Sequence, residues 1–241
     1  MIRTTTSRAV LKTLAVTLLL SSTPVAAQDG QPPLPKLKHV IDTHIHLFDT
    51  TREDGVPWPP ASDKVLHKPH LPAEYSAIAK AAGVTGVVVV EASDRLADNT
   101  WVLEQMKDPM FVGLVGNIDP YRKDFGDQLA KLRKDKRFVG IRARNAKSIN
   151  YLDEQVLTNF RILEKMDLTL DILANGKGVA GVKEVTELAA KVPDLKIVVD
   201  HVLGYDIDGK PPGQDWLDAV AELAKHPNVH CKVSGLSLIH I

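Results

Sequence analysis

Short runs of β-branched residues alternate with longer segments of helical periodicity, and this alternation constrains the fold most strongly. In the segment 153–166, Val156, Phe160, Leu163 and Met166 recur every three or four positions, which predicts one apolar stripe on a helix. Alternating strand and helix units of this kind form parallel sheets covered by helices. The predicted strands are Val40–His46, Gly86–Glu91, Phe111–Ile118, Phe138–Arg142, Leu168–Leu173, Lys196–His201 and Asn228–Ser234. The predicted helices are 72–82, 99–107, 124–134, 153–166, 178–192 and 214–225.

Two α/β architectures fit this order: an open doubly wound sheet and a β/α barrel. A Rossmann-type sheet would carry a Gly-rich turn after its first strand, but the segment 46–49 there reads HLFD. Polar residues instead end nearly every predicted strand, and active sites of β/α barrels are built from those strand ends. The sequence therefore predicts a TIM-like (β/α)8 barrel that lacks its last strand.

The N-terminus has the order of a Sec-type signal peptide. Arg3, Arg8 and Lys12 precede the apolar run 14–20, and small residues follow it up to Ala27. These small residues predict cleavage after Ala27. Because the apolar run is far shorter than the ~20 residues that span a bilayer, we expect no membrane anchor. The predicted localisation is the periplasm or the exterior of the cell.

The last six residues, Leu236–Ile241, read LSLIHI, which is the peptide encoded by the start of a transposon end used in preparing sequencing libraries. We interpret 236–241 as an adapter artefact that truncates a longer gene; an apolar strand tail is the alternative. The incomplete barrel then spans 28–235, and we expect the truncated chain itself to be inactive.

Charge and cysteine content narrow the functional classes. The chain has 30 Lys and Arg against 30 Asp and Glu, and this balance argues against a nucleic-acid partner, which usually requires a basic excess. Cys231 is the only cysteine, which excludes an internal disulfide and a cysteine-based zinc site. The composition carries no signal for a particular oligomeric state.

The segment VIDTHIHLFD, residues 40–49, contains the first candidate site. Asp42, His44 and His46 alternate with apolar residues, so in a strand they face one side together. An H-x-H pair at a strand end can bind one divalent metal, most often zinc, with Asp42 as an orienting partner. A hydrogen-bonded histidine pair without metal is the alternative. His201, at the end of IVVDH, is predicted to be the third nitrogen ligand or a general base.

Two arginines and a glutamate extend the predicted site. Arg142 and Arg144 lie two residues apart at the end of FVGIR, where both can present donors to a carboxylate or carbonyl. Glu91 ends the apolar run GVVVVE and needs a partner there, such as an arginine, a metal or a substrate hydroxyl. We assign Arg142 and Glu91 to catalysis and Arg144 to substrate binding; an exposed salt bridge is the alternative for the arginines.

Two further residues are candidates for substrate binding. Trp58 lies in the long Pro-rich segment 49–72, and a connection of this length is typical of a lid over a site. Packing of the lid is the alternative role for Trp58. Asn117 follows the third predicted strand, with a hydrogen-bonded role in the scaffold as its alternative.

Several motifs, in this order, resemble those of the amidohydrolase-related metal-dependent hydrolases, in the branch of the sugar-lactone and aromatic-dicarboxylate lactone hydrolases. The motifs are IDTHIHLFD, VVVVEAS followed by DN and W at 98–101, VGNIDP, FVGIR, VVDH and CKVSGL. The resemblance implies a distorted β/α barrel that hydrolyses small cyclic esters. It matches His44 and His46 to the first-strand pair, His201 to a later histidine and Arg142 to a substrate-side arginine. The family's aspartate on the last strand has no counterpart, and some lactonases of this branch are thought to act without metal.

We therefore expect water to attack a lactone carbonyl that Arg142 and either a metal or the cluster of His44, His46 and His201 polarise. The substrate is expected to be a small lactone or carboxylate. A zinc-dependent decarboxylase on the same barrel and a catalytically silent periplasmic binding protein are the alternatives.

Overall fold

The computed structural model describes residues 37–143, 149–173, 177–205, 207 and 209–234. The chain divides into two compact units, Met1–Leu37 and Lys38–Ile241, and the fold is that of the second unit. The predicted signal peptide at 1–27, the predicted substrate ligand Arg144 and the segment 236–241 lie outside the described residues.

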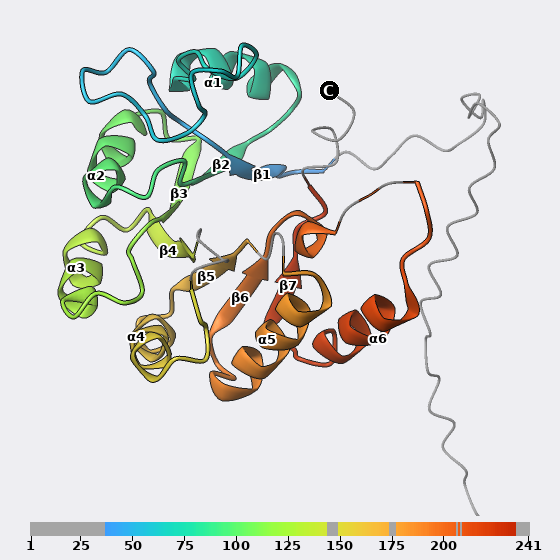
Figure 1. Cartoon of the computed structure of the whole chain (residues 1–241). Helices are drawn as coiled ribbons and strands as arrows, with labels where there is room; N and C mark the ends of the chain where they lie inside the picture. Colours follow the sequence, from blue (N-terminus) through green and yellow to red (C-terminus); the bar gives the residue numbers. More distant parts are fainter. Residues whose placement is uncertain (1–36, 144–148, 174–176, 206, 208, 235–241) are drawn as a thin grey trace, which may run out of the picture. The chain divides into compact units, whose positions relative to one another are not determined.

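Seven parallel strands form one sheet in which each strand pairs with the next along the chain. They are β1 (Ile41–Ile45), β2 (Gly86–Val90), β3 (Phe111–Gly116), β4 (Phe138–Ala143), β5 (Thr169–Ile172), β6 (Lys196–Val199) and β7 (Val229–Cys231). A doubly wound sheet reverses its strand order, whereas this order never reverses. The strands follow one another around an arc (Figure 1), which confirms the prediction of a (β/α)8 barrel that lacks a strand.

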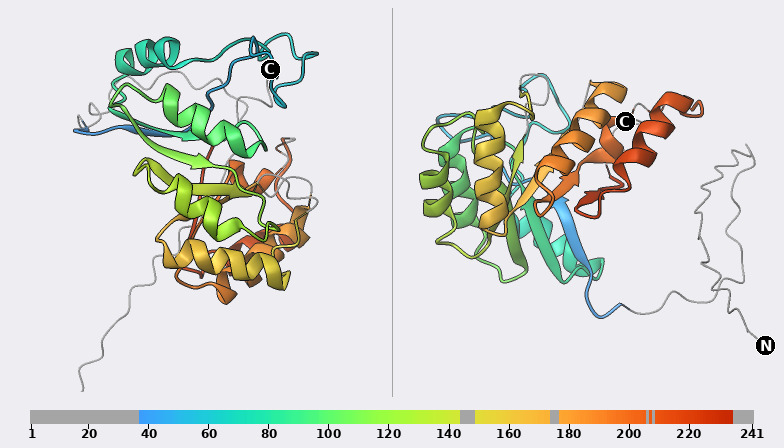
Figure 2. Two further views of the ribbon diagram at one scale, coloured as in Figure 1. Left: turned by 90° about the vertical axis from the view of Figure 1, so that its left-hand side faces the viewer. Right: turned by 90° about the horizontal axis from the view of Figure 1, so that it is seen from below.

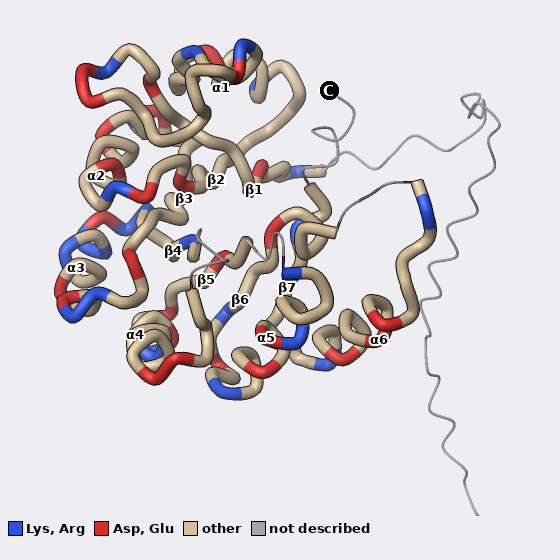
Figure 3. Tube along the Cα trace, in the orientation of Figure 1, with Lys and Arg blue, Asp and Glu red and all other residues tan. Residues whose placement is uncertain are grey.

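Six α-helices follow strands β1 to β6 and lie on the outer side of the arc (Figures 1 and 2). They are α1 (Pro72–Ala81), α2 (Leu96–Gln105), α3 (Phe125–Leu132), α4 (Glu154–Lys165), α5 (Gly178–Lys191) and α6 (Gln214–Leu223). Along these helices, Lys and Arg positions are interspersed with Asp and Glu positions (Figure 3). In the described part of the chain, no helix combines the length and the apolar character needed to cross a membrane.

The core lies where the apolar faces of the helices meet the sheet. In α4, Val156, Phe160 and Leu163 are fully buried, as the predicted stripe requires. The helix begins where the carboxylate of Asp153 accepts hydrogen bonds from the backbone N–H groups of Gln155 and Val156, since that carboxylate caps its free donors. Packing of this kind holds the helices against the strands and fixes where each strand ends.

The close pairing of β4 and β5 brings two charged residues of the site next to each other. Gly140 lies opposite Thr169, and a Cβ atom at Gly140 would come within 2.5 Å of the Thr169 carbonyl oxygen. Only glycine permits this approach of the two backbones. The same register brings Arg142 beside Asp171 at the carboxyl ends of the strands.

Two residues near the end of the sheet differ in detail from their predicted setting. His201 does not end a strand but begins the 3-10 turn η1 (His201–Gly204), in which His201, Val202 and Leu203 have φ of 53°, 52° and 62°. Cys231 lies in β7, within the predicted strand 228–234, where a strand cysteine is expected to be buried, yet it is exposed. Among the described residues β7 pairs only with β6, so one side of it has no covering strand.

Candidate active site

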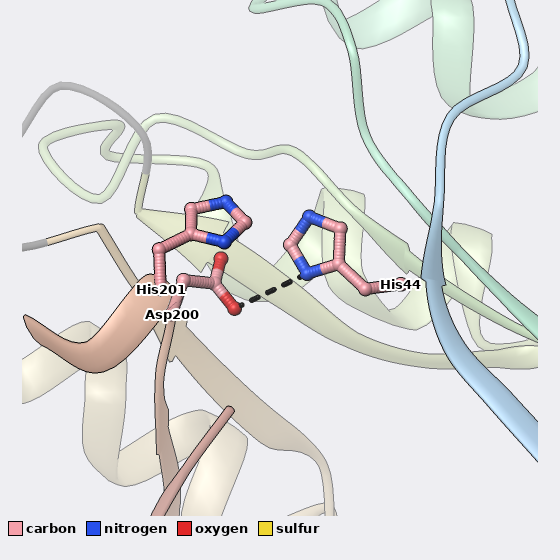
Figure 4. Close-up of side chains that lie close together, drawn as sticks. All are labelled: His44, Asp200 and His201. Atoms are coloured by element: carbon pink, nitrogen blue, oxygen red, sulfur yellow. Dashed lines mark ion pairs between the residues drawn. The ribbon is translucent and has the colours of Figure 1, made fainter. Parts of the chain in front are cut away.

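His44, Asp200 and His201 form a compact group at the carboxyl ends of β1 and β6. Their candidate ligand atoms all lie within 4.8 Å of one another. The imidazole ring of His44 comes from β1 and that of His201 from the turn η1 after β6, and their centroids are 4.7 Å apart. His44 Nδ1 lies 3.5 Å from Asp200 Oδ1 (Figure 4). Within the described residues this is the group of histidine and acidic side chains suited to hold a metal.

The left-handed turn η1 sets the direction of His201. Non-glycine residues rarely adopt positive φ, and three in succession need support from their surroundings. The Val202 N–H donates to the Lys232 carbonyl at 3.0 Å, and the Leu203 N–H donates to the Asp200 carbonyl at 3.1 Å. His201 Nδ1 also lies 3.0 Å from Ser234 Oγ, so both the backbone and the ring are fixed.

Two cations flank Asp200, whose side chain is completely buried. Lys232 Nζ lies 3.1 Å from Oδ1, and Arg142 Nη1 lies 3.5 Å from Oδ2. Burial alone would raise the pKa of Asp200, but the neighbouring His44, Lys232 and Arg142 together hold this pKa below its usual value. Asp200 is therefore a carboxylate that can bind a cation.

Burial lowers the pKa of His201, and the nearby charge of His44 lowers it further. The imidazole of His201 is consequently neutral near pH 7. A neutral imidazole has a lone pair that can bind a metal or accept a proton, which are the two roles predicted for His201.

Arg142 and Glu91 form a buried ion pair next to this group. Arg142 Nε donates to Glu91 Oε1 at 2.7 Å, and Arg142 Nη2 donates to the Glu91 carbonyl at 2.7 Å. Each side chain is only 4% exposed. Glu91 has the arginine partner that its position in the sequence requires, and it orients Arg142 toward Asp200.

A cavity of about 540 Å³ lies beside Arg142. Trp58 from the lid segment and Asn117 after β3 also line it, together with the acidic side chains of Asp94 and Asp119. Its volume is in the range of small-molecule sites. Two predicted substrate ligands and one predicted catalytic residue thus share one cavity.

Asn117 is held in place by the backbone and by Asn99. Its N–H donates to Asn99 Oδ1 at 2.8 Å, while Asn99 Nδ2 donates to the Asn117 carbonyl at 2.7 Å. These two hydrogen bonds give Asn117 the alternative role in the scaffold. Asn117 also lines the cavity.

His46 lies outside the three-residue group. Its Nδ1 is 2.9 Å from the Val90 carbonyl oxygen, and its ring contacts His44 and Trp58 edge to face. Its role as a metal ligand therefore stays a prediction. Asp42 accepts a 2.6 Å hydrogen bond from the Tyr75 hydroxyl and a bond from the His44 N–H, so it fixes the strand rather than an imidazole.

The sequence analysis did not identify Asp200, Lys232 or Asp171 as site residues. Lys232 follows β7 and binds Asp171 Oδ2 at 2.5 Å. Burial raises the pKa of Asp171, against the opposing charge of Lys232. The one signal in the sequence was position, because all three residues lie at the carboxyl ends of predicted strands.

The residues present fit a divalent metal. His44 Nε2 is buried and has no hydrogen-bond partner among the described residues. Two imidazoles and a carboxylate form a donor set that zinc accepts, and a catalytic zinc uses three protein ligands and keeps one open position.

Comparison with known proteins identifies the family of this chain. The amidohydrolase family model matches residues 41–239, which is most of the chain and includes every strand of the sheet. The chain belongs to the amidohydrolase family. This membership confirms the resemblance noted from the motifs and makes the chain a hydrolase of that superfamily.

Three relatives of this amidohydrolase are informative. L-fucono-1,5-lactonase of Burkholderia ambifaria is 30% identical over 205 residues, which cover 81% of this chain and 67% of the relative. An amidohydrolase structure from Burkholderia multivorans with bound zinc is 23% identical with a TM-score of 0.72, covering 83% of this chain and 71% of that one. A probable 2-pyrone-4,6-dicarboxylic acid hydrolase from Acinetobacter baumannii with bound citric acid is 16% identical with a TM-score of 0.65, covering 83% and 71%. At these identities the two structures show the fold alone, and they are β/α barrels in agreement with the sheet described above.

Proposed function

We propose that this amidohydrolase opens small cyclic esters, either sugar lactones or dicarboxylate lactones. The observation that carries the proposal is the 30% identity to a lactonase over 205 residues, which cover 81% of this chain. The cavity supports it, because a buried arginine, an amide and an indole line a space of about 540 Å³. A small ring with one carbonyl and several hydroxyls or carboxylates suits such a wall.

In this proposal each predicted substrate-binding or catalytic residue has a defined role. Arg142, held by Glu91, donates to the lactone carbonyl as negative charge develops on its oxygen. Trp58 packs against the ring, and Asn117 and Arg144 bind its polar groups. His201 accepts a proton from the attacking water when it is not a metal ligand.

We further propose that His44, Asp200 and His201 hold a divalent metal, with zinc the best fit to their donor atoms. When bound, zinc supplies Lewis-acid activation of water or of a carbonyl oxygen. His46 is an additional predicted ligand.

Proton release in a pH-stat tests the proposal, with L-fucono-1,5-lactone and 2-pyrone-4,6-dicarboxylate as substrates. Because an eighth strand beyond Gly235 is expected from the sequence, the assay uses this chain and, in parallel, the product of the uninterrupted gene. Arg142→Gln should lower kcat by about 100-fold, since it removes a donor to the developing oxyanion. The matched control is Arg122→Gln, because Arg122 is a partly exposed arginine paired with Asp124.

Each alternative has its own outcome in this assay. Hydrolysis that survives complete chelation of divalent metals would reject the metal role and leave the lactonase. Release of carbon dioxide from a hydroxybenzoate without lactone hydrolysis would identify a decarboxylase. Tight binding of a lactone without turnover by the complete gene product would identify a binding protein.

We also propose that the protein is exported. The order of basic, apolar and small residues in 1–27 supports this location. N-terminal sequencing of protein from a periplasmic fraction should then begin at Gln28. Protein found only in the cytoplasmic fraction, with Met1 as its first residue, would contradict export.

A further inference from the structure

Lys232 contacts two of the three candidate metal-binding residues, Asp200 and His44. It follows β7 directly, and its side chain is 13% exposed. Its Nζ lies 3.1 Å from Asp200 Oδ1 and 3.3 Å from His44 Nδ1. Those two atoms belong to the candidate metal ligands, and they are the same pair that Figure 4 joins by a dashed line.

The ammonium group supplies the charge that these buried groups require. Asp171 and Asp200 are almost completely buried, and a buried carboxylate needs a cation or several donors. Lys232 contacts both carboxylates, while Arg142 contacts the second oxygen of Asp200, Oδ2. Arg142 is also paired with Glu91, so Lys232 is the one lysine or arginine among the described contacts that binds both Asp171 and Asp200.

A divalent ion added to this arrangement meets two unfavourable contributions. It competes with Lys232 for Asp200 Oδ1, and it is repelled by the ammonium a few ångströms away. Repulsion between charges at such short range is large inside a protein, where the effective dielectric constant is well below that of water.

Lys232 has a second partner to which it can withdraw. Its contact with Asp171 Oδ2, at 2.5 Å, is shorter than its contacts with Asp200 and His44. Asp171 is on β5, whereas Asp200 follows β6, so the two carboxylates hold the ammonium from different strands. A small rotation of the lysine side chain toward Asp171 would release the ligand atoms and keep its charge paired.

We propose that the Lys232 ammonium and a divalent metal are alternative occupants of the Asp200–His44 pair. In the metal-free protein Lys232 bridges Asp200, His44 and Asp171; when a metal binds, Lys232 is held by Asp171 alone. Lys232 thus lowers the metal affinity of the site and keeps its ligands in place without metal. This inference builds on the metal ligands assigned under the proposed function, but it does not depend on which substrate is hydrolysed.

Zinc affinity, measured by competition with a chromophoric chelator, tests the inference on the full chain without any turnover. Lys232→Met should bind zinc at least tenfold more tightly than the wild type, because the competing charge is removed. Lys232→Gln keeps a polar donor and should show the same direction, which covers a failure of the methionine variant to fold. Lys232→Arg keeps the charge and should stay within about threefold of the wild type.

The control is Lys225→Met, since Lys225 is exposed and paired with Glu222 at the end of α6. Its zinc affinity should equal that of the wild type. Adding His44→Asn to Lys232→Met should abolish the gain, which places the bound zinc at this site.

Unchanged or weaker zinc binding by folded Lys232→Met and Lys232→Gln would overturn the inference. So would an equal gain in Lys232→Arg, because charge would then not be the cause. A lactonase assay that fails while Lys232→Met gains zinc affinity would reject the proposed substrate and leave the inference standing.

Discussion

At the scale of single residues, the Arg142–Glu91 pair combines structural and chemical roles. Removing one member leaves the other charge buried without its partner, which is more costly than losing the pair. We predict that Arg142→Met lowers the free energy of unfolding by about 3–5 kcal/mol, and that adding Glu91→Gln recovers part of this loss. Urea unfolding of the two single variants and the double variant measures the coupling, expected at about 1–3 kcal/mol.

The Arg122–Asp124 pair provides the control cycle, because both side chains are about two-fifths exposed. Solvent screens such a pair, so its coupling should stay below about 1 kcal/mol. Equal couplings for the two pairs would show that burial does not control the strength of the Arg142–Glu91 interaction.

Residue types at strand ends indicated part of the site and missed part of it. Glu91, Arg142 and His201 are polar residues at the ends of predicted strands, and this position made each of them a candidate site residue. Asp200 lies at a strand end too, but its role depends on contacts with Lys232 and His44, which come from distant parts of the chain. The pattern within one strand predicts toward which face of the sheet a side chain points. Charge pairing across a barrel depends on contacts between strands, which the sequence of one strand does not determine.

At the scale of elements, the turn η1 is the one whose backbone departs from its predicted form. IVVDH reads as a continuous strand, since β-branched residues favour extended backbone. The hydrogen bond from the Val202 N–H to the Lys232 carbonyl holds Val202 in the left-handed region instead. A tertiary contact therefore overrides local propensity where His201 must be aimed.

This strain can be measured by substitution. Val202→Gly should raise the free energy of unfolding by about 1 kcal/mol, because glycine adopts φ of 52° without the steric cost that valine has. Val198→Gly is the matched control, since Val198 is also half-buried but lies in the extended strand β6. There the same change should lower the free energy of unfolding by about 1 kcal/mol or more.

Thermal and urea unfolding of both variants decide the matter. A loss of stability in Val202→Gly as large as that in Val198→Gly would mean that the turn is not strained. A gain in stability combined with a lower affinity for zinc would show that the strained turn positions His201.

At the scale of the whole molecule, the order of elements along the chain was enough to predict the architecture. Each β-branched run became a strand, each apolar stripe became a helix on the outer side, and the absence of a Gly-rich turn excluded the doubly wound sheet. Exposure at the ends of the sheet was not predictable in the same way. Cys231 has the sequence context of a core strand residue, yet it is exposed because, among the described residues, β7 has a neighbour on one side only.

The two outer strands give the last prediction. Within the described residues β1 and β7 each pair on one side, and the apolar side chains of Ile41 and Val233 near them are 52% and 78% exposed. Open edges of this kind pair with other chains. The 241-residue chain should therefore associate as its concentration rises in sedimentation velocity. Ile41→Lys combined with Val233→Lys should reduce this association, because charged side chains on an edge oppose pairing.

Ile78→Lys is the control, since Ile78 is 64% exposed on α1 rather than on a strand edge, and it should leave association unchanged. A chain that stays monomeric at every concentration, or an equal effect of Ile78→Lys, would show that the strand edges do not drive association.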